Sequence, residues 1–288
     1  MTPPPPARRA CLVVPGSAPA KLAKAPGLGA DEIVIDLEDA VLPAAKDEAR
    51  AVVVAALAEL DWSGTTVSVR VNGRATPWCR ADVEALAAAG GPLRSIVLPK
   101  AESGEDVAFV AELLGDAPPR LQALVETAAG VLRAPEIAAA SERLEALVVG
   151  YADLAVSLGR TPAGAADVRM WDAVREAVLL AARAHGLQAI DGPYLGVAVD
   201  EAFVAGARRA RDQGCDGKWA IHPAQVEPLK ACFAPSEAEV AHARAVLGAL
   251  AAAERDGGQG AVALDGQMLD EPVRLAALRV LARAGEAA

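Results

Sequence analysis

Three residues have the side-chain types needed to hold a divalent cation beside an anionic substrate group. Arg70, Glu126 and Asp153 each lie at or just after the end of a short apolar run. Two carboxylates with a few water molecules suit Mg2+, which prefers oxygen ligands and keeps part of its hydration shell. The arginine keeps its charge and can bind a carboxylate through two hydrogen bonds. No histidine pair or cysteine set with the spacing of zinc ligands competes with this interpretation.

An acidic cluster formed by Asp36, Glu38 and Asp39 follows another apolar run. Its carboxylates repel one another unless a positive charge lies among them, and the Arg70 guanidinium can supply that charge. Acids around an arginine also fix its orientation. Arg70 can therefore be held by the cluster and bind substrate at the same time.

Two lysines, Lys21 and Lys24, follow Pro15-Gly16 and lie one turn apart on the expected first helix. One interpretation is a solvated helix face. The other is a phosphorylated ligand bound by the two ammonium groups and by the N–H donors at the start of the helix.

Lys100 and His222 also follow apolar runs, and each has two interpretations. A desolvated lysine at a strand end can form a Schiff base, but Glu102 follows closely and a salt bridge to the acidic cluster is the simpler role. His222 precedes Pro223 and can act as a base or as a structural hydrogen-bonding residue.

The apolar runs that precede these residues alternate with helical stretches along the chain. Runs rich in Val, Ile and Leu without polar alternation predict strands buried on both faces of a parallel sheet. Eight of them predict a (β/α)8 TIM barrel, whose chemistry lies at the C-terminal ends of the strands. The alternative is an open doubly wound sheet, but no G-x-G-x-x-G follows the first run. The predicted strands are residues 10–14, 32–37, 66–71, 95–98, 121–125, 146–149, 187–190 and 219–221.

Polar residues at seven successive strand ends favour a site at the barrel mouth. Each of them can instead cap the helix that follows, as Asp153 before Leu154 would. We expect the barrel to span residues 1–223 and residues 224–288 to form a C-terminal helical extension. The extension contains predicted helices at 237–253 and 271–284 around a glycine-rich segment at 256–260. It is too short for an independent domain, so we expect it to pack on the barrel or on a neighbouring subunit.

Composition excludes several classes of protein. The chain has 28 basic and 38 acidic residues and a net charge of −10, which argues against a nucleic-acid partner because such proteins normally carry a basic surface. No window has the ~18 apolar residues of a membrane span, and the first residues lack the apolar stretch of a secretory signal. The four cysteines share no C-x-x-C spacing, so we expect free thiols and a cytoplasmic location.

Eight motifs, in this order along the chain, resemble the citrate lyase β-subunit-like (CitE-like) branch of the HpcH/HpaI aldolase superfamily. They are VPG at 14–16, IDLEDAV at 35–41, VRVN at 69–72, LPKAE at 98–102, ETAAG at 126–130, GYADL at 150–154, GKWAIHPAQ at 217–225 and LDGQMLD at 264–270.

The resemblance implies a TIM-barrel enzyme, usually a homotrimer, that breaks or forms a C–C bond between an acyl thioester and a 2-oxo acid. It places the magnesium ligands on Glu126 and Asp153 and the substrate-carboxylate arginine on Arg70. It places the contacts to coenzyme A near Lys21 and Lys24.

In the malyl-CoA and citramalyl-CoA lyase members of the family, an aspartate from a neighbouring subunit's C-terminal arm completes the site. That residue corresponds to Asp270, which we expect to protonate the thioester enolate directly or through a water molecule. The expected substrate is a 2-hydroxyacyl thioester such as malyl-, citramalyl- or citryl-CoA. Three alternatives stay open: a Schiff-base aldolase that uses Lys100, a β subunit of a citrate lyase complex that acts on citryl-acyl carrier protein, and a binding protein without activity.

Overall fold

The computed structural model describes residues 6–160, 168–255, 262–264 and 266–285. The chain divides into two compact units, Met1–Phe233 and Ala234–Ala288.

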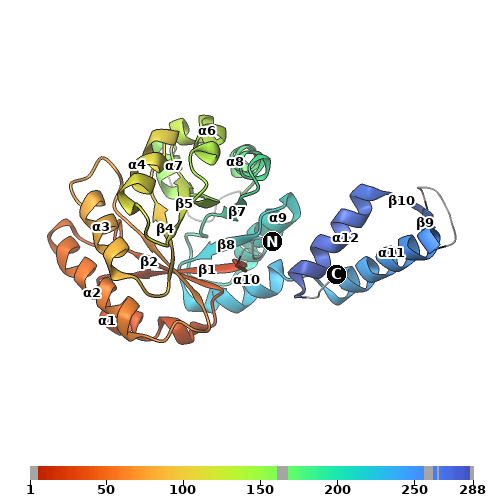
Figure 1. Cartoon of the computed structure of the whole chain (residues 1–288), viewed down its shortest axis with the longest axis horizontal. Coiled ribbons are helices and arrows are strands. Elements are labelled where there is room, and N and C mark those ends of the chain that lie inside the picture. The colour runs from red at the N-terminus through yellow and green to blue at the C-terminus, as the bar shows by residue number, and fades with distance from the viewer. Residues whose placement is uncertain (1–5, 161–167, 256–261, 265, 286–288) are drawn as a thin grey trace. The chain divides into compact units, whose positions relative to one another are not determined.

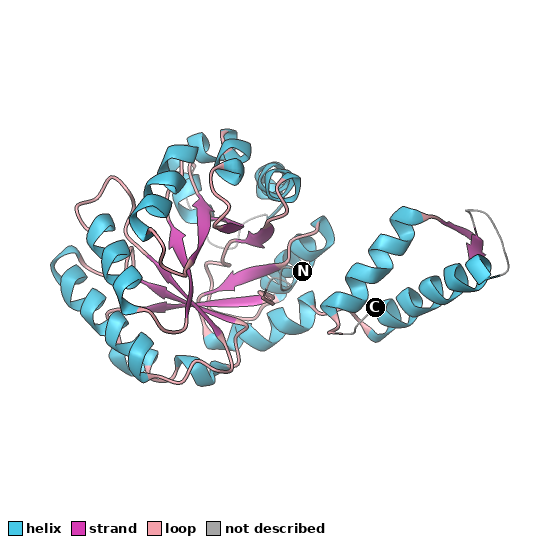
Figure 2. Ribbon diagram, in the orientation of Figure 1, coloured by secondary structure: helices cyan, strands magenta, loops and turns pink. Residues whose placement is uncertain are grey.

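The first unit is a closed barrel of eight parallel strands arranged in sequence order, with β1 paired to both β2 and β8. Figures 1 and 2 show the strands enclosed by helices. The predicted (β/α)8 TIM barrel is therefore confirmed. The strands are β1 (Ala10–Pro15), β2 (Glu32–Asp36), β3 (Thr66–Arg70), β4 (Leu93–Leu98), β5 (Arg120–Val125), β6 (Leu144–Val149), β7 (Gln188–Asp191) and β8 (Gly217–Ala220).

The helices of the first unit follow the strands, and polar caps start several of them. Ser103 and Asp106 form a capping box at α4, and Thr127 caps α5 by accepting a hydrogen bond from the Gly130 N–H. The α-helices are α1 (Pro19–Leu22), α2 (Lys46–Glu59), α3 (Cys79–Ala89), α4 (Gly104–Leu114), α5 (Ala128–Leu132), α6 (Ala134–Ala139), α7 (Tyr151–Ser157), α8 (Asp172–Ala184), α9 (Glu201–Gln213) and α10 (Val226–Phe233). The 3-10 helices are η1 (Ala25–Leu28), η2 (Pro43–Ala45), η3 (Val168–Trp171) and η4 (Pro223–Gln225).

The start of the chain differs from the expected single helix that carries both lysines. Helix α1 has four residues and contains Lys21, whereas Lys24 lies beyond it at the start of η1. Pro26 belongs to η1 and has no N–H to donate, so an α-helix cannot continue through it unbroken. The prediction of one helix with the two lysines a turn apart is wrong.

The end of the first unit lies beyond residue 223, where we placed the end of the barrel. Helix α10 belongs to this unit and contacts β1 and β8. Its buried residues Val226, Leu229 and Phe233 form part of the core.

The inside of the barrel has a polar layer at the N-terminal ends of the strands. Arg8 is fully buried there and its Nε lies 3.0 Å from Glu32 Oε2, while a second nitrogen contacts Glu145. Gln122 donates hydrogen bonds to Glu32 Oε1 (2.7 Å) and to the Ser95 hydroxyl (2.9 Å). Further along the same strands, apolar side chains such as Val34, Val97 and Leu124 fill the interior.

The second unit contains α11 (Glu237–Arg255), the short antiparallel strands β9 (Val262–Leu264) and β10 (Gln267–Leu269), and α12 (Glu271–Arg283). Its two helices match the predicted pair, whereas the hairpin was not predicted. The glycine-rich segment at 256–260 lies outside the described residues. No helix within the described residues of either unit is long and apolar enough to cross a membrane.

Candidate active site

The Arg70 guanidinium is fixed at the mouth of the barrel by Asp36. These residues are register partners at the ends of β3 and β2, and Arg70 donates from Nε and Nη2 to the two carboxylate oxygens at 2.8 and 2.6 Å. Nη1 lies 3.0 Å from Glu38 Oε2 and 3.9 Å from Asp39. Burial alone would raise the pKa of Asp36, but the bonds from Arg70 lower it. The acidic cluster thus holds Arg70 as the sequence analysis anticipated.

Glu126 follows β5 and is 2% exposed. Its Oε1 accepts a hydrogen bond of 2.9 Å from the Lys100 N–H. On its other side, Glu126 lies directly over Gly150, where an added Cβ would stand 2.4 Å from Oε2. Burial first, then the charges of Glu38 and Asp153, raise the pKa of Glu126 to about 8 despite the opposing charges of Lys100 and Arg70.

Asp153 lies in the first turn of α7 and is one third exposed. The helix is capped by Gly150, so Asp153 does not serve as its N-cap and the cap interpretation is wrong. Its carboxylate faces the acidic cluster, because Oδ1 lies 3.5 Å from the Lys100 ammonium.

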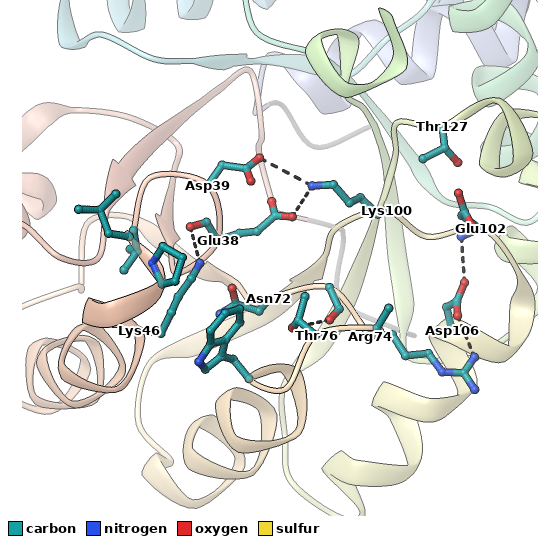
Figure 3. A pocket seen from close by; sticks show the side chains of 16 residues that line it. Glu38, Asp39, Lys46, Asn72, Arg74, Thr76, Lys100, Glu102, Asp106 and Thr127 are labelled. Atoms are coloured by element: carbon teal, nitrogen blue, oxygen red, sulfur yellow. Dashed lines mark hydrogen bonds and ion pairs between the residues drawn. The ribbon is translucent and has the colours of Figure 1, made fainter. Parts of the chain in front are cut away.

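The Lys100 ammonium lies among the acids, as Figure 3 shows for Glu38 and Asp39. Nζ is 2.5 Å from Glu38, 3.8 Å from Asp39 and 4.0 Å from Glu126. Burial would lower the pKa of Lys100, but the hydrogen bond to Glu38 and the surrounding negative charges raise it instead. A Schiff-base lysine needs a neutral amine, so this environment opposes that chemistry.

A cavity of about 850 Å3 opens beside the acidic cluster and Lys100, and Arg70, Glu126 and Asp153 are not among its lining residues (Figure 3). Glu38, Asp39 and Lys100 line it on the side of the acidic cluster. Residues of the loop after β3, including Arg74 and Trp78, line the other side. The cavity is large enough for a small organic acid together with part of a larger ligand.

The donor set suits Mg2+ bound partly by water. Among the residues that the structure describes, no three His, Cys, Asp or Glu side chains could form a metal site on their own. Two carboxylates, Glu126 and Asp153, are sufficient for Mg2+ because it retains several waters and binds substrate oxygens. Burial first, then the neighbouring carboxylates, raise the pKa of Glu126, so a divalent cation bound there would stabilise its charged form.

Four other residues singled out in the sequence have these surroundings in the structure. Lys21 and Lys24 are exposed at the β1–α1 connection, and no contact of either ammonium group with the acidic cluster is found. Asp270 belongs to the second unit, where it is exposed and caps α12 by accepting a hydrogen bond from the Val273 N–H at 3.2 Å. His222 caps η4, since its Nδ1 accepts a hydrogen bond of 3.2 Å from the Ala224 N–H, which agrees with the structural interpretation.

A buried network that the sequence analysis did not predict supports the start of α7. Asp191, at the end of β7, accepts hydrogen bonds from Lys218 Nζ (2.5 Å), Arg175 Nε (2.9 Å) and the Tyr151 hydroxyl. Burial would raise the pKa of Asp191, but the Lys218 and Arg175 charges lower it. Tyr151 is two positions before Asp153, so this network fixes the backbone that carries Asp153, the proposed Mg2+ ligand. The sequence signal that could have revealed this network is the pair of opposite charges at Asp191 and Lys218, which lie on neighbouring strands.

Comparisons with known proteins show which family the chain resembles. The sequence model of the HpcH/HpaI aldolase/citrate lyase family matches residues 9–223. An L-malyl-CoA/beta-methylmalyl-CoA lyase from Cereibacter sphaeroides is 38% identical over 296 residues, which cover 94% of this chain and 93% of the relative. A (3S)-malyl-CoA thioesterase from the same species is 42% identical over 276 residues, or 96% and 94% of the two chains.

Among solved structures, protein CitE from Mycobacterium tuberculosis in complex with magnesium, acetoacetate and coenzyme A has a TM-score of 0.79 and 36% identity. The similarity covers 99% of this chain and 100% of that one. The family match over the barrel and the relatives that extend over nearly the whole chain confirm the predicted resemblance: this chain belongs to the HpcH/HpaI aldolase/citrate lyase family.

Proposed function

We propose that the protein is a Mg2+-dependent carbon–carbon lyase that cleaves a CoA thioester whose C3 carries both a hydroxyl group and a carboxylate, as in malyl-CoA, into an acyl-CoA and a 2-oxo acid. The observation that carries this proposal is the guanidinium of Arg70, held by Asp36 beside the buried carboxylate of Glu126. The malyl-CoA lyase relative and the CitE complex with magnesium and coenzyme A support the same substrate class and cation.

Each residue of the site has a role in this reaction. Glu126 and Asp153 would hold Mg2+, which supplies electrophilic polarisation at the oxygen that becomes the carbonyl of the 2-oxo acid. Arg70 binds and orients the substrate carboxylate through Nη1, because Nε and Nη2 are already bonded to Asp36. Glu38 and Asp39 keep the Arg70 guanidinium in place.

As the C–C bond breaks, the substrate hydroxyl loses its proton to solvent and becomes the carbonyl of the 2-oxo acid, while the second fragment leaves as a thioester enolate and needs a proton on carbon. We assign that proton to Asp270 of a neighbouring subunit, or to a water molecule that it positions. Support comes from the exposed side chain of Asp270 at the start of α12. The assignment requires an oligomer, which we propose to be a homotrimer in which the second unit, residues 234–288, acts as the arm.

Lys21 and Lys24 are assigned to the phosphates of coenzyme A, because both side chains are exposed near the end of β1. Lys24 reaches this position from η1 rather than from the first helix.

The four cysteines are free, which supports a cytoplasmic location.

Thioester hydrolysis is the second candidate, because one relative named as a (3S)-malyl-CoA thioesterase is 42% identical over 96% of this chain. The two reactions give different products. Cleavage of malyl-CoA yields acetyl-CoA and glyoxylate, whereas hydrolysis consumes water and yields malate and free coenzyme A.

The test is an assay of the purified protein with Mg2+ and malyl-, β-methylmalyl-, citramalyl- or citryl-CoA, in which both products are quantified. We expect an acyl-CoA and a 2-oxo acid in equal amounts, loss of turnover with EDTA, and at least a thousandfold lower kcat in Glu126→Gln. Free coenzyme A without 2-oxo acid would establish the thioesterase instead. Activity on citryl-acyl carrier protein alone would identify a citrate lyase subunit.

A further inference from the structure

The backbone at Lys100 is in a conformation that side chains disfavour. Among the residues that the structure describes, Lys100 is the one non-glycine residue with positive φ, at 51°. Glycine adopts this region without steric cost, whereas a Cβ is crowded there. Such residues occur at functional sites, where surrounding contacts hold the strained conformation. The lysine side chain at this position therefore needs an explanation.

Both the backbone N–H and the side-chain ammonium of Lys100 are directed at the proposed metal site. Its N–H donates to Glu126 Oε1 at 2.9 Å, so the left-handed backbone binds one proposed ligand directly. Its ammonium lies within 4.0 Å of four carboxylates, among them Asp153 at 3.5 Å and Glu126 at 4.0 Å. The strongest contact is with Glu38 at 2.5 Å, which is not a proposed ligand.

Arg70 cannot neutralise these four acids on its own. It forms a paired hydrogen-bonded contact with Asp36, and its third nitrogen lies beside Glu38. Lys100 differs because its ammonium ends a flexible four-carbon stem and its side chain is 38% exposed. It can move by a few ångströms and still keep its bond to Glu38.

We propose that Lys100 is the internal counter-cation of the metal site. Its ammonium neutralises Glu126 and Asp153 in the metal-free protein and competes with the divalent cation for them. When the cation binds, the ammonium keeps its bond to Glu38 and moves away from Glu126 and Asp153, and repulsion between the two positive charges weakens cation binding. Lys100 thus sets the affinity of the site and keeps the cation exchangeable. This inference rests on the proposed function, because it requires the cation site at Glu126 and Asp153.

The experiment measures binding of Mn2+, used as a paramagnetic substitute for Mg2+, by electron paramagnetic resonance on the full-length protein. We expect Lys100→Met to bind Mn2+ at least tenfold more tightly than the wild type. The metal-free variant should melt at a lower temperature, because its four acids lack their counter-charge, and Mn2+ should raise its Tm by more than it raises that of the wild type.

The variant Lys100→Gly separates the effect of the ammonium charge from the effect of backbone strain, because it removes both whereas Lys100→Met removes only the charge. Glycine accepts a φ of 51° without cost, so this variant should show the same gain in Mn2+ affinity with a higher metal-free Tm than Lys100→Met. It also keeps the test valid if Lys100→Met does not fold. Lys230→Met is the matched control, since it removes the same charge from α10, where the ammonium contacts Glu227 and the Gly29 carbonyl. Its Mn2+ affinity should equal that of the wild type.

The outcomes distinguish this inference from the proposed function. Unchanged or weaker Mn2+ binding in both Lys100 variants, with wild-type binding that Glu126→Gln abolishes, would overturn the counter-cation role and leave the proposed lyase intact. Absence of Mn2+ binding in the wild type would overturn both.

Discussion

Asp36 and Arg70 are register partners on β2 and β3, and the carboxylate accepts two hydrogen bonds from the guanidinium at 2.8 and 2.6 Å. The pair is nearly excluded from solvent, since the Asp36 side chain is 1% and the Arg70 side chain 11% exposed. A charge pair in this setting fixes geometry more reliably than a surface pair does. The direction of Arg70 is thus determined by the pairing of two strands.

Asp36→Asn should remove one negative charge and loosen Arg70. We expect the free energy of unfolding to fall by about 3 kcal/mol, the range for breaking a buried ion pair, and KM for the acyl thioester to rise more than kcat falls. Urea denaturation and steady-state kinetics measure the two effects. Asp116→Asn, on an exposed loop, is the control. A KM equal to that of the wild type would contradict the positioning role of Asp36.

Gly150→Ala should displace Glu126. The new Cβ would stand 2.4 Å from Glu126 Oε2 and 2.5 Å from its Cβ, so rotation of the carboxylate does not relieve the overlap and the backbone must shift as well. We expect at least a tenfold loss of Mn2+ affinity, measured by electron paramagnetic resonance. Gly64→Ala makes the same change where no atom lies within 4 Å, and it should bind Mn2+ like the wild type. Normal affinity in Gly150→Ala would show that the position of Glu126 does not matter for the cation.

The barrel was predictable because each of its strands can be recognised from a short stretch of neighbouring residues. Each strand contains a short run rich in apolar residues, and the residues that could do chemistry, such as Glu126 and Asp153, follow those runs at one end of the barrel. Strand β4 shows the limit of this approach. It begins at Leu93, before the predicted start at residue 95, because the exposed Arg94 interrupts the apolar pattern.

Contacts between residues far apart in the sequence could not be predicted in the same way. The left-handed backbone of Lys100 directs its N–H at the Glu126 carboxylate, and a glycine is needed at position 150 because a Cβ there would overlap the Glu126 side chain. Neither requirement is visible in local composition. The β9–β10 hairpin was missed because strands of three residues do not establish a periodic pattern.

The pKa of Glu126 predicts how cation binding depends on pH. Burial and the charges of Glu38 and Asp153 raise this pKa from 4.5 to about 8 in the metal-free protein. Between these values the folded protein holds a proton that the unfolded chain has lost, so this group's contribution to the free energy of unfolding decreases as pH rises. Cation binding requires the carboxylate and displaces that proton. Stabilisation by Mg2+ should therefore increase from pH 6 to pH 8.

Differential scanning calorimetry at pH 6, 7 and 8, with and without Mg2+, measures this trend. The Mg2+-induced rise in Tm should grow at each step in the wild type and be small at every pH in Glu126→Gln. A rise that is the same at all three pH values in the wild type would contradict the shifted pKa.

Arg8→Met should destabilise the barrel from the end opposite to the site. Arg8 is 1% exposed and neutralises Glu32 and Glu145. Its loss leaves the buried Glu32 carboxylate without a positive partner, whereas Glu145 keeps its ion pair with Arg94. We expect a loss of about 4 kcal/mol, typical of removing one member of a buried ion pair. Trp fluorescence in urea measures this loss, because all four tryptophans belong to the first unit.

The double variant Arg8→Met/Glu32→Gln should recover part of the lost stability. It removes the negative charge of Glu32, which Arg8 no longer neutralises, and keeps an acceptor for the Gln122 side chain. Mn2+ affinity should stay at the wild-type value in both, because the network contacts none of the proposed ligands. A change in affinity would show that the two ends of the barrel are coupled.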